Sequence, residues 1–293
     1  MPEPAAPKNK LEAVLASGTP VGAIDVSIGP RFLELFSDHL YSSPNKAFEE
    51  IVANSWDAGA TDVYISMPDD LSKADATVWI LDNGESMDAT GLEQLWVVAD
   101  SDKRRKASPK RRQIGKFGIG KLATYLIADE LTYVCKASDG VVRTVTMDYR
   151  RIDSIGGARL NVTPLKLDIR KVTDAELNAI LQACDPTGTL AKMIASGVPK
   201  GPPSEGYADE FGGDEGSVAG ASSGTWTLVV LSSLKEAGRA MQPGQIRRLL
   251  RTALPLGSSM SVSFNNDALP LVQGGRLDRE GVEDRHRPRN WAP

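Results

Sequence analysis

The sequence predicts an α+β protein in which helices cover one face of a β-sheet. Apolar residues follow a helical spacing mainly in the early part of the chain, whereas strand-like alternation dominates later. No internal repeat interrupts this order. Apolar residues make up 41% of the 293 residues and charged residues 25%, which is the composition of an ordinary globular protein. Together these observations favour a sandwich of one helical layer and one sheet.

Each element is predicted from its local pattern. The helix at 45–58 has the clearest boundaries, because Ser43-Pro44-Asn45 precedes it and Gly59 follows it as a stop signal. Residues 62–67 alternate like a half-buried strand, and the apolar run at 77–81 is typical of a central strand. Further strands are predicted at 131–136, 141–147, 225–231 and 260–264, and further helices at 31–40, 90–99, 119–129, 173–183 and 242–253.

The same reading divides the chain into one domain with flanking segments. Residues 1–20 are rich in Pro, Ala and Lys and are expected to form a flexible arm, so the domain is placed at 21–270. Within it, residues 201–224 hold seven glycines and several acids, which predicts a mobile acidic loop. Residues 271–293 are polar and charged, and we interpret them as a tail or a truncated linker.

Charge and composition exclude several classes of protein. The net charge of −4 argues against coating nucleic acid by bulk charge, although a local basic patch stays open. No apolar run reaches the roughly 18 residues of a membrane helix, and the N-terminus does not resemble a secretory signal. Two distant cysteines and two histidines offer no thiolate or imidazole zinc site, so we expect a cytoplasmic protein.

Polar side chains gather on one face of the predicted helix at 45–58. At about 100° per residue, Glu50, Asn54 and Asp57 fall within roughly 60° of one another, opposite Phe48 and Val52. A solvated face of an amphipathic helix is the simplest explanation. The alternative, a functional cluster, depends on the two segments that follow.

The second segment is Asp82-Asn83-Gly84-Glu85-Ser86-Met87, which directly follows an apolar strand. An acid followed by glycine is a common turn. A carboxylate at a strand end can also accept a hydrogen bond from an exocyclic amine such as that of adenine. Gly84 would allow a flat ring to approach the backbone.

The third segment, Ile114-Gly115-Lys116-Phe117-Gly118-Ile119-Gly120-Lys121, opens a predicted helix. Glycines before a helix let backbone N–H groups converge, and the helix N-terminus favours an anion such as phosphate. The segment nearly matches the phosphate-binding pattern GxxxxGK[ST]. It departs from that pattern because Leu122 replaces the hydroxyl residue and no strand precedes it.

In their order and spacing, ExxxNxxDA, DNGxxM and GxFGIG together resemble the GHKL ATPases, which include gyrase B, heat-shock chaperones, histidine kinases and MutL. Gly224-Thr225 at the start of a late strand matches a fourth element of that family. The resemblance spans about residues 24–264. It implies the Bergerat fold, a two-layer α/β sandwich with a mixed, mostly antiparallel sheet, and it implies an ATPase that uses ATP and Mg²⁺.

The resemblance also implies roles for individual residues. Glu50 would be the general base that activates water, Asn54 would complete the coordination of Mg²⁺, and Asp82 would read the adenine amine. The further nucleotide-binding positions carried over are Asp57, Gly84, Met87, Ser101, Lys103, Gly115, Lys116, Phe117, Gly118, Ile119, Gly120, Lys121 and Thr225.

Residues 99–120 correspond to the nucleotide lid of these ATPases. Ser101-Asp102-Lys103 resembles the Ser-x-Lys signature of the MORC and heat-shock branch, and lid closure would drive dimerisation. Two positions depart from the family: Ser86 replaces a usual glycine, and Lys121 stands where chaperones often carry an aromatic residue.

Three further expectations concern function. Seven of the ten residues from Lys103 to Arg112 are basic, so this run is either a solvated lid loop or a DNA-binding surface. Few residues follow the last predicted strand, so the domain that supplies a basic residue to the γ-phosphate in relatives is expected to be missing. Either the chain is truncated or a partner supplies that residue. A nucleotide-sensing module that does not hydrolyse ATP is the alternative to an ATPase.

Overall fold

The computed structural model describes residues 17–26, 45–95, 120–151, 165–198, 224–253 and 260–269. Their strands form one sheet in the order β1-β6-β5-β4-β7-β3-β2-β8-β9. Among the described strands, β2 and β8 pair in parallel and all other pairs are antiparallel. The strands are β1 (Thr19–Val26), β2 (Asp62–Ser66), β3 (Val78–Asp82), β4 (Ala128–Lys136), β5 (Val142–Asp148), β6 (Leu165–Lys171), β7 (Trp226–Leu234), β8 (Ser261–Phe264) and β9 (Asp267–Ala268). This arrangement confirms the predicted α+β fold with a mixed, mostly antiparallel sheet.

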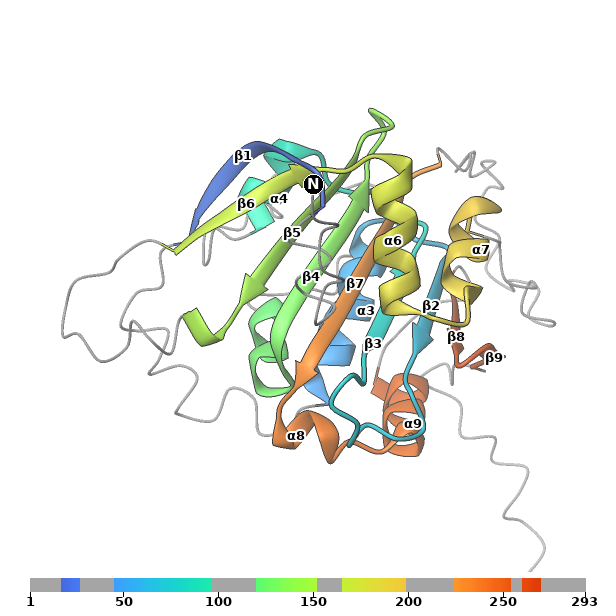
Figure 1. Cartoon of the computed structure of the whole chain (residues 1–293). Helices are drawn as coiled ribbons and strands as arrows, with labels where there is room; N and C mark the ends of the chain where they lie inside the picture. Colours follow the sequence, from blue (N-terminus) through green and yellow to red (C-terminus); the bar gives the residue numbers. More distant parts are fainter. Residues whose placement is uncertain are drawn as a thin grey trace, which may run out of the picture.

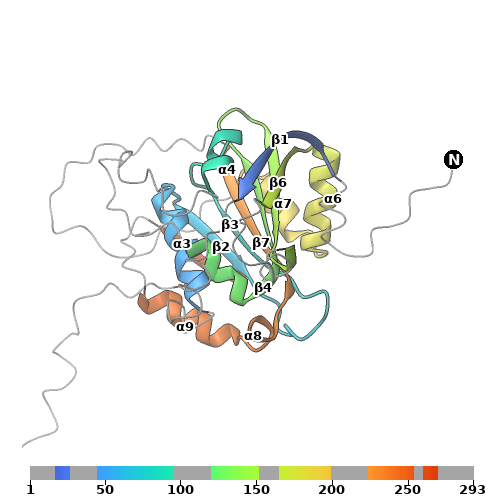
Figure 2. The same ribbon diagram turned by 90° about the vertical axis from the view of Figure 1, so that its left-hand side faces the viewer.

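Helices lie on both faces of this sheet (Figures 1 and 2). Alternation along β3 explains why both faces are apolar: Val78 and Ile80 belong to one buried cluster, whereas Trp79 and Leu81 belong to the other. The first cluster includes α3 and α9, and the second includes α6 and α7. The helices are α3 (Lys46–Asp57), α4 (Ala89–Leu95), the 3₁₀ helix η2 (Gly120–Leu126), α6 (Asp174–Cys184), α7 (Thr189–Ala195), α8 (Glu236–Arg239) and α9 (Pro243–Ala253).

The helix pair on the second face corrects one part of the sequence analysis, which placed helices on one face only. Helix α6 begins with a capping box, in which the side chains and backbone N–H groups of Thr173 and Glu176 bond reciprocally. Leu177, Ile180 and Leu181 of α6 are buried against the sheet. The apolar residues of β3 and β7 on this face therefore need the α6–α7 pair as a cover.

The helix predicted at 119–129 is shorter than expected. η2 ends at Leu126, and the chain is already in β4 at Ala128, which pairs with Leu234 of β7. Backbone pairing with a long neighbouring strand outweighs the helical propensity of this segment. The sequence analysis also missed β1, β6, β9, α7 and α8, and β1 begins at Thr19, inside the predicted arm.

The other predicted elements agree with the structure within a few residues where it describes them. The helix predicted at 31–40 and residues 96–99 of the helix predicted at 90–99 lie outside the described residues, as do nearly all of the lid and of the acidic loop and the whole of the tail. No helix within the described ranges combines the length and apolar character needed to cross a bilayer.

Candidate functional site: a carboxylate at the end of a buried strand

Helix α3 forms one wall of the candidate site. Its apolar side, which includes Phe48 and Val52, is buried against the sheet. The predicted polar residues Glu50, Asn54 and Asp57 are each partly exposed. The amphipathic pattern therefore directs the three polar side chains away from the core, as the helical spacing predicts.

Asp82 is the last residue of β3 and is only 5% exposed. One carboxylate oxygen accepts a hydrogen bond from the Ser55 hydroxyl of α3 at 2.9 Å. The other accepts the Gly84 backbone N–H at 2.9 Å. Burial raises the pKa of Asp82 to about 6, and the bonds from Gly84 and Ser55 oppose this rise. A buried carboxylate with this pKa is a candidate ligand-binding group.

Gly84 passes very close to the C-terminal end of α3. A Cβ atom at this position would lie 2.9 Å from the Ala58 carbonyl oxygen and 3.1 Å from the Ala60 nitrogen. The same Ala58 carbonyl accepts the Glu85 N–H at 2.7 Å. Glycine is therefore needed here because backbone meets backbone.

Asn83 joins the loop after β3 to the start of β2. Its side-chain oxygen accepts the N–H groups of Thr61 and Asp62, both at 2.9 Å. Its amide group donates to the Thr61 hydroxyl and to the Asp62 carboxylate, also at 2.9 Å. The two residues Asp82 and Asn83 thus bind the loop to α3 on one side and to β2 on the other.

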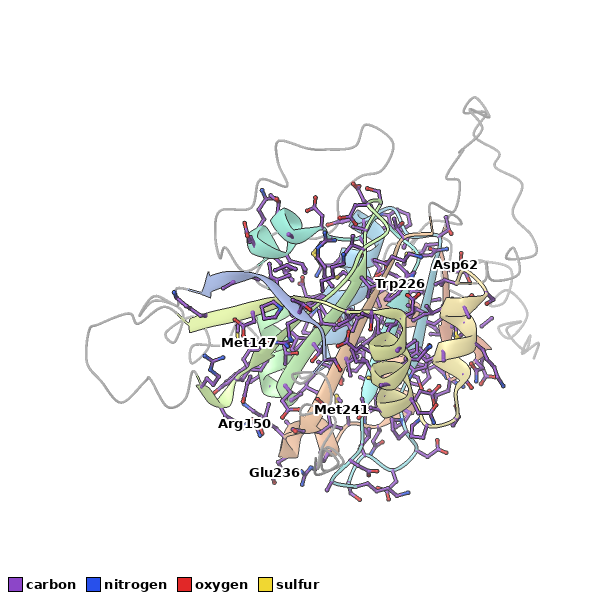
Figure 3. All side chains as sticks on the ribbon, turned by 45° about the horizontal axis from the view of Figure 1, so that its top comes forward. Asp62, Met147, Arg150, Trp226, Glu236 and Met241 are labelled. Atoms are coloured by element: carbon purple, nitrogen blue, oxygen red, sulfur yellow. The ribbon has the colours of Figure 1, made fainter. Side chains whose placement is uncertain are left out.

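Two threonines of the β7 region complete the site, although only one of them was predicted. The Thr225 hydroxyl donates to the Gly84 carbonyl at 2.9 Å, so it holds the loop. Thr227 lies directly across the sheet from Asp82 and donates to the Ser86 hydroxyl at 3.0 Å. This end of the sheet is where Trp226 is labelled in Figure 3.

Ser86 is therefore held by the sheet, and this gives a structural role to its departure from the family pattern. Cys135 of β4 also pairs with Thr227 and contacts the Ser86 side chain and the Met87 backbone. Burial raises the pKa of Cys135 to about 12, so this thiol is neutral. Met87 packs partly buried against the core cluster that contains α3.

The predicted residues Glu50, Asn54 and Asp57 lie on the partly exposed side of α3. The predicted residues Asp82, Gly84 and Thr225 are joined by hydrogen bonds around the end of β3, and Ser55 links this group to α3. Gly120 and Lys121 begin η2, which packs against α3. The predicted residues Ser101, Lys103, Gly115, Lys116, Phe117, Gly118 and Ile119 lie outside the described residues.

We expect the stability of the protein to depend on pH through Asp82. The pKa of this group is about 6 in the folded state and 3.8 for an ordinary aspartate, so the folded state binds a proton more tightly than the unfolded chain does. The free energy of unfolding should therefore fall as pH rises from about 4 to 6, by roughly 3 kcal/mol in total. Urea unfolding at stepped pH should show this fall in the wild type relative to Asp82→Asn, and parallel curves would contradict it.

Comparison with known proteins agrees with this geometry. Residues 41–177 match the model of the family described as histidine kinase-, DNA gyrase B-, and HSP90-like ATPase. The matched range contains α3, the loop after β3 and η2. It therefore includes every described site residue except those of the β7 region.

One curated relative is a protein of Herpetosiphon aurantiacus named "Putative type II restriction enzyme HgiDII". It is 32% identical over 121 residues, which are 40% of this chain and 18% of the relative. The aligned part thus spans less than a fifth of that protein's length. The family match and the arrangement around Asp82 lead to one conclusion: residues 41–177 are similar to the GHKL ATPases.

Proposed function

We propose that this domain binds ATP together with Mg²⁺ and hydrolyses the nucleotide. The observation that carries the proposal is the buried Asp82 carboxylate, which Ser55 of α3 and Gly84 hold at a strand end. A fixed, buried acceptor is suited to a ligand that presents a hydrogen-bond donor.

Adenine is the base that fits this acceptor. Its exocyclic amine donates a hydrogen bond, whereas guanine presents a carbonyl oxygen at the corresponding position. Ser55 and Gly84 hold the Asp82 carboxylate in one orientation, and Thr225 holds the Gly84 carbonyl beside it. Thr227, opposite Asp82, is the neighbour placed to support the base from the sheet.

Asn54 would contribute an oxygen ligand to the magnesium ion. The residues fit this role, because Asn54 is partly exposed on the same helix face as Glu50, and its side-chain oxygen is a hard ligand. No cluster of three or more acidic, cysteine or histidine side chains suited to a metal occurs among the described residues. Mg²⁺ is usually coordinated by one or two protein oxygens together with phosphate oxygens. When bound, the ion would neutralise charge on the phosphates.

Glu50 is the residue we assign as general base. The neighbouring Glu49 forms an ion pair with Lys46 at 2.7 Å. Glu50 lies one turn before Asn54 on the partly exposed face of α3. From that position its carboxylate can take a proton from a water molecule that attacks the terminal phosphate.

Titration calorimetry of the intact chain tests nucleotide recognition directly. We expect ATP with Mg²⁺ to bind and GTP with Mg²⁺ to bind at least tenfold more weakly, because guanine lacks the donor that Asp82 accepts. CTP, which carries an exocyclic amine on a smaller ring, serves as the size control. Equal affinities for ATP and GTP would contradict the assignment of Asp82.

We further propose that residues 99–120 act as a lid and that the backbone N–H groups of Gly115–Gly120 bind the phosphates. Closure of the lid on ATP would create a surface for self-association. The basic residue expected at the γ-phosphate would come from a partner or from another part of the protein.

Hydrogen exchange is the measurement for the lid. A non-hydrolysable ATP analogue should increase protection across residues 103–121, because bound phosphates give these amides an acceptor. Sedimentation under the same conditions should shift from monomer towards dimer. Unchanged exchange despite confirmed nucleotide binding would reject the lid, whereas a protected lid in a monomer would reject only the dimerisation.

A second candidate is an ATP-dependent module that works on DNA. The similarity to a protein named as a restriction enzyme favours this candidate, as does the basic run from Lys103 to Arg112. Duplex DNA binding should then increase with the ATP analogue and weaken steeply with salt. If glutamine replacements throughout the basic run leave the affinity for DNA unchanged, this surface is not the DNA site.

A further inference from the structure

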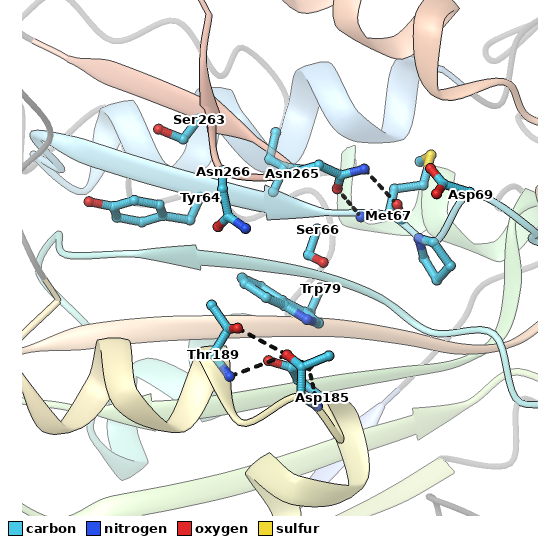
Figure 4. A pocket seen from close by; sticks show the side chains of 13 residues that line it. Tyr64, Ser66, Met67, Asp69, Trp79, Asp185, Thr189, Ser263, Asn265 and Asn266 are labelled. Carbon is cyan, nitrogen blue, oxygen red and sulfur yellow. Dashed lines mark hydrogen bonds between the residues drawn. The ribbon is translucent and has the colours of Figure 1, made fainter.

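A cavity lies on the sheet face opposite the candidate ATP site. Its volume is about 230 Å³, and its walls come from the end of β2, the β8–β9 turn, β3 and the turn before α7. This is smaller than the roughly 300–1,000 Å³ of pockets that hold drug-sized ligands. Figure 4 shows the indole of Trp79 between Ser66 and the segment where the turn at Asp185 leads into α7 at Thr189. No part of the proposed ATPase mechanism uses these residues.

Strand alternation separates this cavity from the ATP site. Trp79 and Ser66 pair across β3 and β2 and point to the face that α6 and α7 cover. Successive side chains of a strand point to opposite faces of the sheet. Asp82 stands an odd number of positions, three, beyond Trp79 in β3, so its side chain lies on the opposite face. A ligand in the cavity would therefore touch none of the groups that we assign to nucleotide binding.

The β8–β9 turn holds two asparagines at the edge of the cavity. Asn265 and Asn266 have φ values of 49° and 69°, which suit a tight hairpin turn. Asn265 is fully engaged, because its side chain bonds both the N–H and the carbonyl of Met67 at 2.8 Å. Asn266 instead presents its amide towards Trp79 in Figure 4.

The charged residues that line the cavity are both acids, Asp69 and Asp185. Asp185 is largely satisfied, since it accepts bonds from Thr187 and from the Leu190 N–H. Asp69 is exposed, and no described residue forms an ion pair with either carboxylate. These acids repel anions such as phosphate.

The indole N–H of Trp79 is the unusual group in this cavity. Trp79 is 5% exposed, and among the described residues no atom accepts a hydrogen bond from this N–H. Buried donors almost always have a partner, and an unmade bond carries the cost of desolvation. The N–H therefore indicates a ligand that brings a hydrogen-bond acceptor into the cavity.

We propose that this cavity binds a neutral, hydroxyl-rich molecule of the size of one sugar unit. A hydroxyl group both donates and accepts, so it can satisfy the Trp79 N–H and the Asp69 carboxylate from one ring. Ser66, Ser263 and the Asn266 amide add groups that also donate and accept. Burial and the nearby Asp62 raise the pKa of Tyr64 to about 12, so the phenol in the wall is neutral as well.

Other classes of ligand fit less well. An anion meets two carboxylates and no cationic side chain in the lining. A simple cation satisfies the acids but leaves the Trp79 N–H facing positive charge. The Trp79 N–H needs an acceptor, and the carboxylates need donors. A sugar provides both in one uncharged molecule.

Indole N–H resonances of the ¹⁵N-labelled full chain provide the test. Glucose, galactose, mannose and N-acetylglucosamine, each titrated to tens of millimolar, are the probes. At least one should shift the Trp79 resonance, assigned by its loss in Trp79→Phe. Trp226, which is buried on the same face but does not line the cavity, should not shift.

Asn266→Gly is the binding variant, because glycine accepts the positive φ of the turn while the amide is removed. The affinity for the sugar should fall about threefold to tenfold, the value of one hydrogen bond. Asn265→Gly is not a matched control, since it breaks the contact with Met67. Gln245→Gly, at an exposed position of α9, serves instead.

The proposal is overturned if none of the four sugars moves the Trp79 resonance. It is also overturned if inorganic phosphate or uncharged nucleosides shift that resonance and the sugars do not. A shift that Asn266→Gly leaves unchanged would place the sugar elsewhere. Binding of ATP should leave the Trp79 resonance in place, so failure here is distinguishable from failure of the ATPase assignment.

Discussion

Replacing Asp82 with Asn should weaken the binding of ATP about 10-fold to 100-fold while the protein stays folded. The carboxylate loses its charge, and the amide group can present N–H donors to the donor of adenine. A hydrogen bond to a charged group contributes about 1.5–3 kcal/mol, which corresponds to this loss. Calorimetric titration of wild type and variant with ATP and Mg²⁺ measures it.

The local contacts explain why the Asn variant should fold. The amide oxygen can keep the Gly84 N–H, and its NH₂ group can donate to the Ser55 hydroxyl. The Ile51 carbonyl lies 3.2 Å from the same hydroxyl. In the variant the hydroxyl can therefore donate to Ile51 and accept from the Asn amide. Removing the buried acid also removes its desolvation cost.

Ser55→Ala is the matched control for this experiment. It removes one partner of Asp82 but leaves the carboxylate and its Gly84 bond in place, so it should weaken ATP binding far less than Asp82→Asn does. If Asp82→Asn bound ATP as tightly as the wild type, adenine would not contact this residue.

The local parts of the site could be predicted from the sequence. The polar face of α3 follows from helical periodicity, and the position of Asp82 follows from an apolar strand that ends in an acid and a glycine. Each of these two patterns is contained in a segment of about ten residues. The structure confirms them because no distant segment competes for the same backbone.

The parts that depend on pairing between distant strands could not be predicted. Thr227 faces Asp82 only because of the register between β3 and β7. The two residues lie 145 positions apart in the sequence, and no local pattern encodes this register. Gly84 is needed because α3 ends against it, which is a tertiary contact. The misjudged helix at 119–129 has the same origin, since pairing with β7 sets the start of β4.

The cavity on the second face was missed for a related reason. Asn265-Asn266 between two short strands is a hairpin signal in the sequence. The turn forms a cavity wall only because it lies beside the start of α7 in the fold. The sequence analysis did not predict that helix.

Glu50→Ala should abolish turnover while ATP still binds. Glu50 is placed to act on water rather than on the nucleotide, and loss of a general base typically lowers the rate about 10²-fold to 10⁴-fold. Alanine is the best helix former, so α3 should persist. Single-turnover hydrolysis of bound ATP is the measurement, because it reports the chemical step without product release.

Glu49→Ala is the matched control, since it removes the adjacent acid on the same helix turn. That variant loses only an exposed ion pair with Lys46, which is worth little in stability, and it should hydrolyse ATP at close to the wild-type rate. Equal rates for Glu50→Ala and an active wild type would show that Glu50 is not the base. A wild type that binds ATP tightly but shows no single-turnover hydrolysis would favour the nucleotide-sensing module instead, because the base would then have no reaction to serve.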